Sequence, residues 1–216
     1  MKKQFKPLVI IVGIIAGISL WWRYAARRRS LPCPPWLDWM LENRYVETVA
    51  NSQAIVERLH LQPGMSVLDV GCGPGRVAIP AAKHVGPDGI VVALDMQADM
   101  LQRLRKRMTE TGVTNIHPLH AGIGEGKVEI GVFDRAVLVT VLGEIPDREA
   151  ALAEIYQTLK PGGLLSVTEF IPDPHYQSRE TVRRLAAAAD FREQASFGNW
   201  LAFTLNFTKF AKPDDT

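Results

Sequence analysis

The chain has 216 residues, of which 47% are hydrophobic and 22% are charged, so we expect one sizeable globular domain with little length left for a second. The net charge of +2 conceals an asymmetry, because seven of the 25 basic residues lie within residues 1–29, which contain no acid. The remaining residues hold 18 basic and 23 acidic side chains. Such a mildly acidic body lacks the basic face of nucleic-acid-binding proteins, so we expect no nucleic-acid partner.

The two cysteines, Cys33 and Cys72, are too few for a disulfide framework and favour a reducing compartment. No group of His, Cys, Asp and Glu has the spacing of a metal site, so we predict no metal. The chain shows no internal repeat.

Residues 8–22 form an unbroken run of apolar and small side chains, LVIIVGIIAGISLWW. Fifteen helical residues span roughly 22 Å, and a helix continued to Ala26, with Arg23 reaching toward the headgroups, approaches the ~30 Å hydrocarbon core. Trp21, Trp22 and Tyr24 cluster at one end, as aromatic residues do at a membrane interface. We therefore predict a single-pass membrane anchor within residues 8–26.

Two alternatives stay open for this segment. A cleaved signal peptide has the same positive and apolar regions, although Arg23 and Arg27–Arg29 follow at once and no A-x-A site precedes them. An interfacial or buried helix is the other alternative. Positive charge flanks both ends of the run, and the larger cluster on its C-terminal side favours a cytoplasmic body.

A proline-rich linker, residues 30–35, follows the anchor segment of residues 1–29, since three prolines in four residues prevent a helix. We assign the folded domain to residues 36–216. Within it, residues 36–62 are predicted to form the first helices, and residues 64–216 an α/β core.

The most informative motif is Val67–Gly75, VLDVGCGPG. An apolar run containing Asp69 leads into three glycines within five positions, which indicates a buried strand, a tight turn and the start of a helix. Glycine permits positive φ and lets a ligand lie against the backbone, and the N–H groups of a helix N-terminus point to the same place. An ordinary glycine turn is the alternative.

Strands and helices alternate after this turn. Apolar runs predict strands over residues 90–94, 116–119, 132–142, 164–168, 191–197 and 200–207. Helical spacing predicts helices over residues 76–85, around 100–108, from a cap at Asp147 to 159, and over 177–188. The last two strands are joined near Gly198 and Asn199 as an antiparallel pair. The alternation therefore indicates an α/β sheet that is mostly parallel with one reversed strand.

Three motifs in this order carry a family resemblance: Val67–Gly75, the strand that ends at Asp95, and Leu159–Gly163, LKPGG. Together they resemble the class I S-adenosylmethionine-dependent methyltransferases, and most of all the subtype that includes ubiquinone and menaquinone methyltransferases. The resemblance covers residues 55–170 and, by topology, the terminal hairpin. It implies a Rossmann-like fold with a seven-stranded, mostly parallel sheet, a C-terminal antiparallel hairpin and helices on both faces. It also implies methyltransferase activity with S-adenosylmethionine as cofactor.

The same resemblance implies which residues bind the cofactor. The loop under its amino-acid end and ribose would consist of Asp69, Gly71, Cys72, Gly73 and Gly75. Asp95 would accept hydrogen bonds from both ribose hydroxyls; a helix N-cap is the alternative role for this residue. Met96 would pack on the adenine, and backbone groups of Gly122 and Ile123 would contact it. Many relatives have an acidic residue near the position of Gly122, and this chain departs from that pattern.

Glu144 is the candidate catalytic residue. It follows the fourth predicted strand in the segment LGEI, where many relatives have a paired-histidine-like segment. Ligands bind at this edge of open α/β sheets, so Glu144 is expected to face cofactor and substrate as a base, an orienting group or a cation-attracting group. A surface or capping carboxylate is the alternative. A base is needed only if the acceptor has a proton to lose, and Glu169, Asp173, His175 and Tyr176 are further candidates.

The leading hypothesis for the acceptor is a membrane-associated or hydrophobic molecule, such as a lipid or a quinone precursor, because the predicted anchor holds the domain beside a bilayer. The alternative is a small soluble amine, thiol or phenol. A non-catalytic, membrane-tethered scaffold is a third hypothesis, which the complete glycine motif and Asp95 oppose. The oligomeric state stays open.

Overall fold

The computed structural model describes residues 51–129, 132–171 and 173–210. The predicted anchor at residues 8–26, the linker at residues 30–35 and most of the predicted helical region 36–62 lie outside these ranges. No helix within the described ranges has both the length and the hydrophobicity that a bilayer-spanning segment requires.

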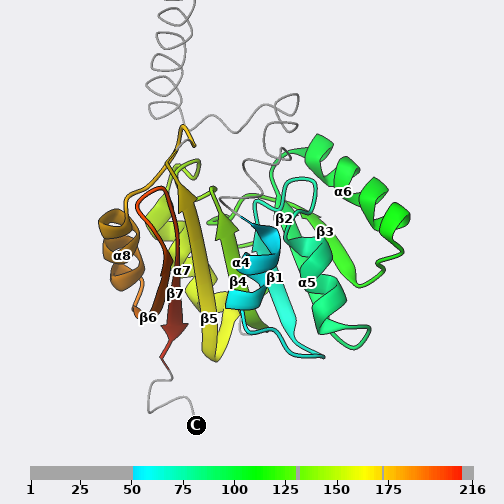
Figure 1. Ribbon diagram of the computed structural model, residues 1–216, viewed down its shortest axis with the longest axis horizontal. Coiled ribbons are helices and arrows are strands. Elements are labelled where there is room, and N and C mark those ends of the chain that lie inside the picture. The colour runs from blue at the N-terminus through cyan, green and yellow to red at the C-terminus, as the bar shows by residue number, and fades with distance from the viewer. Residues whose placement is uncertain (1–50, 130–131, 172, 211–216) are drawn as a thin grey trace, which may run out of the picture.

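The described strands form one seven-stranded sheet in the order β3-β2-β1-β4-β5-β7-β6 (Figure 1). Their bounds are Ser66–Val70 (β1), Ile90–Asp95 (β2), Ile116–His120 (β3), Phe133–Val139 (β4), Leu159–Phe170 (β5), Phe191–Gly198 (β6) and Ala202–Lys209 (β7). Strands β1 to β5 pair in parallel, and β7 is antiparallel to both β5 and β6. The predicted mostly parallel sheet with a C-terminal antiparallel hairpin is confirmed.

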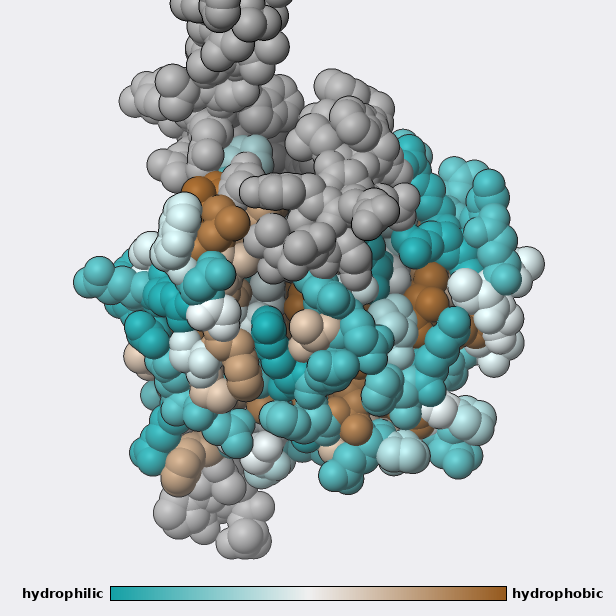
Figure 2. All heavy atoms as spheres, in the orientation of Figure 1, coloured by the Kyte–Doolittle hydropathy of each residue, from teal (hydrophilic) through white to brown (hydrophobic). Residues whose placement is uncertain are grey.

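Helices cover both faces of the sheet, as predicted. Their bounds are Ser52–Arg58 (α4), Ala78–Val85 (α5), Ala98–Thr111 (α6), Arg148–Thr158 (α7) and Arg179–Ala188 (α8). Helices α4, α5 and α6 share one hydrophobic cluster with one face, and α7 and α8 share another with the opposite face. The outer surface of α6, at the right of Figure 2, is mostly hydrophilic, as expected for its Arg and Lys residues.

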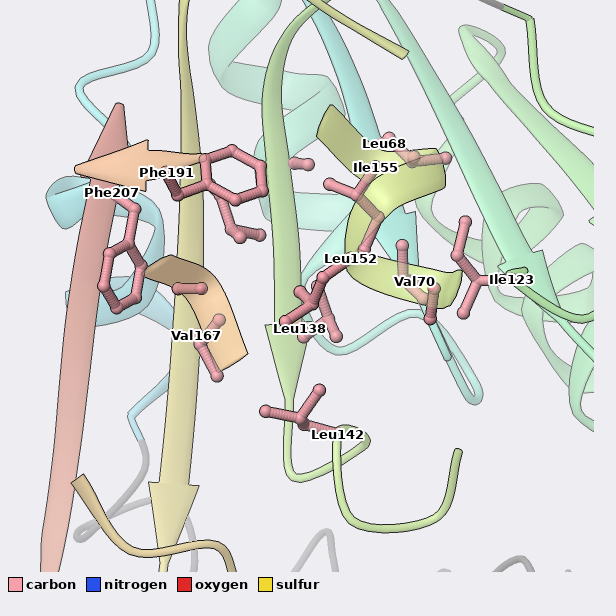
Figure 3. Packing of buried hydrophobic residues seen from close by; sticks show 14 of the residues in the cluster. Leu68, Val70, Ile123, Leu138, Leu142, Leu152, Ile155, Val167, Phe191 and Phe207 are labelled. Atoms are coloured by element: carbon pink, nitrogen blue, oxygen red, sulfur yellow. The ribbon is translucent and has the colours of Figure 1, made fainter. Parts of the chain in front are cut away.

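Strand alternation divides the core between the two faces. On β1, Val67 belongs to the cluster under α5, whereas Leu68 and Val70 belong to the cluster under α7. Figure 3 shows Leu152 and Ile155 of α7 among side chains of the central strands. Full burial of such a side chain contributes about 1.5–3 kcal/mol, so these contacts hold β1 and β4 firmly beneath the edge where their loops emerge.

Two strand boundaries differ from the sequence prediction by three residues or more. Strand β4 ends at Val139 rather than at residue 142, because Thr140 has φ +57° and cannot continue a strand. Strand β5 begins at Leu159 rather than at 164, and its pairing with β4 is irregular between Phe133 and Arg135. The cap of α7 is as predicted, since the side chain of Asp147 accepts a hydrogen bond from the Ala150 N–H at 2.9 Å.

Helix α4 is held at its C-terminal end by contacts to β4 and β7. Arg135 Nε donates to the Leu59 carbonyl at 2.7 Å, and Asn206 Nδ2 donates to the Arg58 carbonyl at 2.7 Å. Arg135 lies near the start of β4, so α4 ends toward the amino edge of the parallel strands. It therefore begins toward their carboxyl edge, where Ile55 lines a cavity.

Candidate active site

A cavity of about 260 Å³ opens at the carboxyl edge of β1, β2 and β4. The loops that follow these strands and β3 line it, together with Ile55 of α4 and Asp173 from the loop after β5. Parallel strands of an open α/β sheet bind ligands at this edge, where the loops of neighbouring strands meet. The cavity is therefore the candidate active site.

The glycine turn after β1 forms the floor of this cavity. The N–H groups of Gly71 and Cys72 donate to the Leu94 carbonyl at 2.8 and 3.0 Å, which ties the turn to β2. Gly71 has φ +67°, and a Cβ there would lie 2.4 Å from Cγ2 of Val141. A Cβ at Gly73 (φ +51°) would meet nothing within 4 Å, so this backbone borders open space. The turn thus leaves room for a ligand to lie directly on it.

Cys72 and Gly75 play different parts in this turn. Cys72 lines the cavity, and burial raises the pKa of its thiol, so it is no nucleophile at neutral pH. Gly75 does not contribute to the cavity lining: it has φ +86°, and a Cβ there would lie 2.5 Å from Cδ1 of Leu104. What Gly75 provides is close packing of the turn against α6.

Asp95, at the end of β2, organises the neighbouring backbone. Its Oδ2 accepts from the Gly73 N–H at 2.9 Å, and its Oδ1 accepts from the Gln97 N–H at 2.8 Å. Burial raises the pKa of Asp95, and the two backbone hydrogen bonds oppose that shift. Each carboxylate oxygen keeps capacity for a further hydrogen bond, so Asp95 can accept two hydroxyl donors from the cavity side.

Asp69 lies deeper in the same cavity and is only 3% exposed. The Ala78 N–H donates to its carboxyl group, but Oδ2 has no hydrogen-bond partner in the described structure. Burial, followed by the nearby charge of Asp95, raises the pKa of Asp69 to about 7. A buried acceptor of this kind is costly unless a donor or a cation reaches it, so the site suits a positively charged ligand group.

The loop after β3 closes one end of the cavity. Gly122 and Ile123 line it, and so does Met96, which is 58% exposed. Glu125 also lines it; its carboxylate accepts from the Gly122 N–H and pairs with Lys127 Nζ at 2.7 Å. The hydrogen bond from Lys127, followed by that from Gly122, lowers the pKa of Glu125, so an ionised acid lies at this end after all. The sequence interpretation missed Glu125 because only the position of Gly122 was compared with the acidic residue of the relatives. The acid between the two glycines of Gly124-Glu125-Gly126 could have indicated it.

The turn after β4 is backbone-strained. Thr140 is a β-branched residue with φ +57°. Two hydrogen bonds hold it in this conformation: its N–H donates to the Thr168 carbonyl at 2.9 Å, and its Oγ1 donates to the Val139 carbonyl. Such a conformation is rare for this residue type and clusters at functional sites. It presses Val141 against Gly71 and starts the turn that carries Glu144 to the cavity.

Of the strand-end acids proposed as bases, the structure brings Glu144 and Asp173 to the cavity lining. Glu169 lies behind them, 1% exposed, with Oε2 accepting from the Gln177 N–H at 3.0 Å, and burial raises its pKa well above the usual range. His175 and Tyr176 also lie outside the lining. The His175 carbonyl packs so closely on Gly143 that no Cβ fits there, so the loops after β4 and β5 support each other.

Comparison with known proteins agrees with this geometry. Residues 67–163 match the family model of the methyltransferase domain. A demethylmenaquinone methyltransferase of Listeria monocytogenes serotype 4a (strain HCC23) is 35% identical over 108 residues, which are 50% of this chain and 46% of that protein. A nocamycin O-methyltransferase of Saccharothrix syringae is 29% identical over 123 residues, 57% of this chain and 44% of that protein. The chain thus spans about half the length of the curated relatives it matches.

The fold has a solved counterpart. The crystal structure of a SAM dependent methyltransferase from Aquifex aeolicus matches with a TM-score of 0.75 and 20% identity, over 82% of this chain and 99% of that one. The described residues share the fold of this S-adenosylmethionine-dependent methyltransferase. Residues 67–163 match a methyltransferase domain, and the two matches together imply S-adenosylmethionine as the cofactor.

The residues of the cavity fit this cofactor. S-adenosylmethionine carries positive charge on its sulfur, which matches the two buried acids and the unpartnered Oδ2 of Asp69. Its ribose hydroxyls match the remaining acceptor capacity of Asp95, and the open space over Gly73 admits a ligand against the backbone.

Proposed function

We propose that this protein transfers the methyl group of S-adenosylmethionine to a hydrophobic, membrane-associated acceptor of the quinone-precursor or lipid class. The observation that carries the proposal is the mixed lining of one cavity, which includes both acidic and apolar side chains. We call Asp69 and Asp95 its polar side, and we call the apolar residues that α4 and the loop after β4 contribute its apolar wall: Ile55, Val141 and Ile145. The similarity to demethylmenaquinone methyltransferases supports a quinone-like acceptor.

The polar side is assigned to the cofactor. Asp95 accepts from the ribose hydroxyls, and Asp69 faces the charged amino-acid end. The backbone of Gly71, Cys72 and Gly73 lies under these two groups, as the sequence interpretation proposed.

The adenine is assigned to the end formed by the loops after β2 and β3. Met96 packs on the ring, and the backbone of Gly122 and Ile123 contacts it. Glu125 adds an acceptor for the adenine amino group, in the place where the sequence comparison found no acid.

The chemistry itself needs little from the protein. When bound, S-adenosylmethionine supplies a methyl group on a positively charged sulfur, which is already an activated electrophile. The apolar wall orients the acceptor in line with that group and excludes water, and such positioning supplies much of the rate enhancement. Glu144, with Asp173 beside the same cavity, takes a proton from an acceptor atom that carries one, or orients that atom.

The predicted anchor at residues 8–26 completes this proposal. It holds the domain, residues 36–216, at a bilayer where hydrophobic acceptors dissolve. The positive charges after the anchor favour a cytoplasmic domain. A small soluble acceptor is the second candidate, which the similarity to nocamycin O-methyltransferase favours. In that case the anchor would serve localisation alone.

The proposal is tested by incubating the full chain with methyl-labelled S-adenosylmethionine and either a lipid extract of membranes or the soluble metabolite fraction. We expect label in a product that partitions with lipids, and none with an Asp95→Ala variant. Label confined to soluble products would refute the hydrophobic acceptor and favour the second candidate.

A further inference from the structure

The tip of the β6–β7 hairpin presents a tryptophan to solvent. Trp200 is 78% exposed, the highest exposure among the large hydrophobic residues that the structure describes. The turn beneath it is well ordered by hydrogen bonds: Asn199 Oδ1 accepts from the N–H groups of Leu201 and Ala202, and the Asn199 N–H donates to the Ala202 carbonyl at 2.8 Å. A single exposed hydrophobic side chain is common on protein surfaces. Trp200 differs because it lies on a hydrogen-bonded turn at the edge of the sheet where the cavity opens.

An arginine braces the same turn from below. Arg179, at the start of α8, donates to Ser196 Oγ at 2.6 Å and to the Asn199 carbonyl at 3.0 Å, and its guanidinium lies over the Phe203 ring. The tip is thus bound to α8 as well as to β7. These contacts fix the backbone that carries Trp200.

The tip lies at the edge of the sheet that carries the active-site cavity (Figure 1). Strand β7 begins at Ala202, which pairs with Phe170 at the carboxyl end of β5, and the Ile171 N–H donates to the Leu201 carbonyl at 2.9 Å. Asp173, two residues after Ile171, lines the cavity. The exposed indole and the cavity mouth therefore belong to one face of the molecule.

The chain before α4 joins the domain at this same face. Helix α4 ends toward the amino edge through its contacts with Arg135 and Asn206, so it begins at the carboxyl edge. The 51 residues that precede it in sequence include the apolar run 8–22 and the basic residues Arg27–Arg29. Figure 2 shows hydrophobic atoms at this end of the described surface, with further groups at the right and in the lower middle.

We propose that Trp200 inserts into the interfacial region of a lipid bilayer and turns the cavity mouth toward the membrane. Tryptophan favours this region because its ring is apolar and its N–H remains available to headgroups. The contact of Trp200 with the bilayer, in addition to the predicted anchor, would set the orientation of the domain. An anchor alone leaves the domain free to rotate. The inference rests on the proposed function, since a mouth that faces the bilayer serves an acceptor dissolved in it.

A protein partner fits this surface less well. An indole buries about 150–250 Å², and the neighbouring Leu201 is already partly buried, whereas a stable protein interface buries about 800 Å² on each partner. An interfacial membrane contact that supplements an anchor needs no more than one such aromatic residue. The small size of the tip therefore favours a bilayer over a second copy of the chain.

The test uses tryptophan fluorescence of the full chain in vesicles of phosphatidylcholine and phosphatidylglycerol, with and without brominated acyl chains, which quench nearby indoles. Changing Trp21, Trp22, Trp36 and Trp39 to Phe leaves Trp200 as the sole tryptophan, which is excited at a wavelength that tyrosine does not absorb. We expect its emission to shift to the blue on addition of vesicles and to lose intensity when the lipids are brominated.

A matched control moves the fluorophore to the other edge of the sheet. Trp200→Phe combined with Phe210→Trp, in the same background, places it just past the end of β7, where Phe210 is 52% exposed. We expect no bromine quenching there. The proposal would be overturned if bromine quenched both variants equally or did not quench Trp200. It would also be overturned if the blue shift appeared without vesicles when the protein concentration was raised. Calorimetry on the same variants should show an unchanged affinity for S-adenosylmethionine. A variant that binds the cofactor normally but shows no quenching would refute the membrane contact of Trp200 and leave the proposed function standing.

Discussion

At the scale of single residues, Asp69 is the most unusual side chain of the site. It lies buried beside Asp95 and has a pKa of about 7, against 3.8 for an ordinary aspartate. Between these two pH values the folded chain keeps a proton that the unfolded chain has lost. The contribution of Asp69 to the free energy of unfolding therefore falls as pH rises through this window, by at most about 1.4 kcal/mol per pH unit.

This linkage predicts the behaviour of an Asp69→Asn variant without cofactor. Asparagine has no such titration, so the variant's free energy of unfolding should depend less on pH between about pH 4 and 7 than that of the wild type. Denaturant unfolding at a series of pH values measures the slope. Asp99→Asn, at an exposed position of α6, should keep the wild-type slope, and equal slopes for all three proteins would contradict the account of Asp69.

The cavity lining could be predicted only in part from the sequence. A motif ties Asp69, Gly71, Gly73 and Asp95 each to a strand end, and because strand ends meet at one edge of the sheet, all four line the cavity. Glu125 was missed because its position depends on how a loop folds back onto Gly122. The strained φ of Thr140 could not be foreseen either, since a β-branched residue gives no local signal for a left-handed backbone.

At the scale of elements, a side chain of α7 bonds to the loop between β3 and β4. Glu154 of α7 is buried, and its carboxylate accepts from the N–H groups of Gly124 and Val128. These two bonds tie the loop to α7, and the same loop carries Gly122 and Ile123 to the cavity.

We therefore predict that Glu154→Ala lowers the free energy of unfolding by about 2–3 kcal/mol, because it leaves buried N–H groups without an acceptor. It should also weaken cofactor binding, since the adenine end of the cavity loosens. Denaturant unfolding and calorimetry measure the two effects. Gln157→Ala, on an exposed part of α7, serves as control and should change stability by less than about 0.5 kcal/mol. A stability equal to that of the control would show that Glu154 does not hold the loop.

Element order was more predictable than element ends. Alternating apolar runs and helical spacing located every described strand, and Asp147 marked the start of α7. The end of β4 was misplaced because Thr140 has a positive φ and its N–H bonds to the Thr168 carbonyl of β5. The start of β5 was misplaced because Leu159 already pairs with Phe133, before an irregularity at residues 160–163. Such tertiary contacts override the local pattern that a sequence shows.

At the scale of the whole molecule, the sheet brings distant segments to one edge. The glycine turn, Asp95, the loop with Gly122 and Glu125, and the turn with Glu144 all meet at the carboxyl ends of parallel strands. The start of α4 and the hairpin tip reach the same edge. One face therefore combines the cavity, the proposed acceptor wall and the start of α4.

The central claim is that this cavity binds S-adenosylmethionine through Asp95, and calorimetric titration of the full chain tests it most directly. We expect one cofactor per chain. An Asp95→Ala variant should lose at least about a hundredfold in affinity, since two hydrogen bonds to a charged group contribute about 1.5–3 kcal/mol each. Circular dichroism checks its fold, because Asp95 also holds Gly73 and Gln97. Asp99→Ala should bind as the wild type does. No binding by the wild-type chain, or equal affinity of a folded Asp95→Ala variant, would contradict the account.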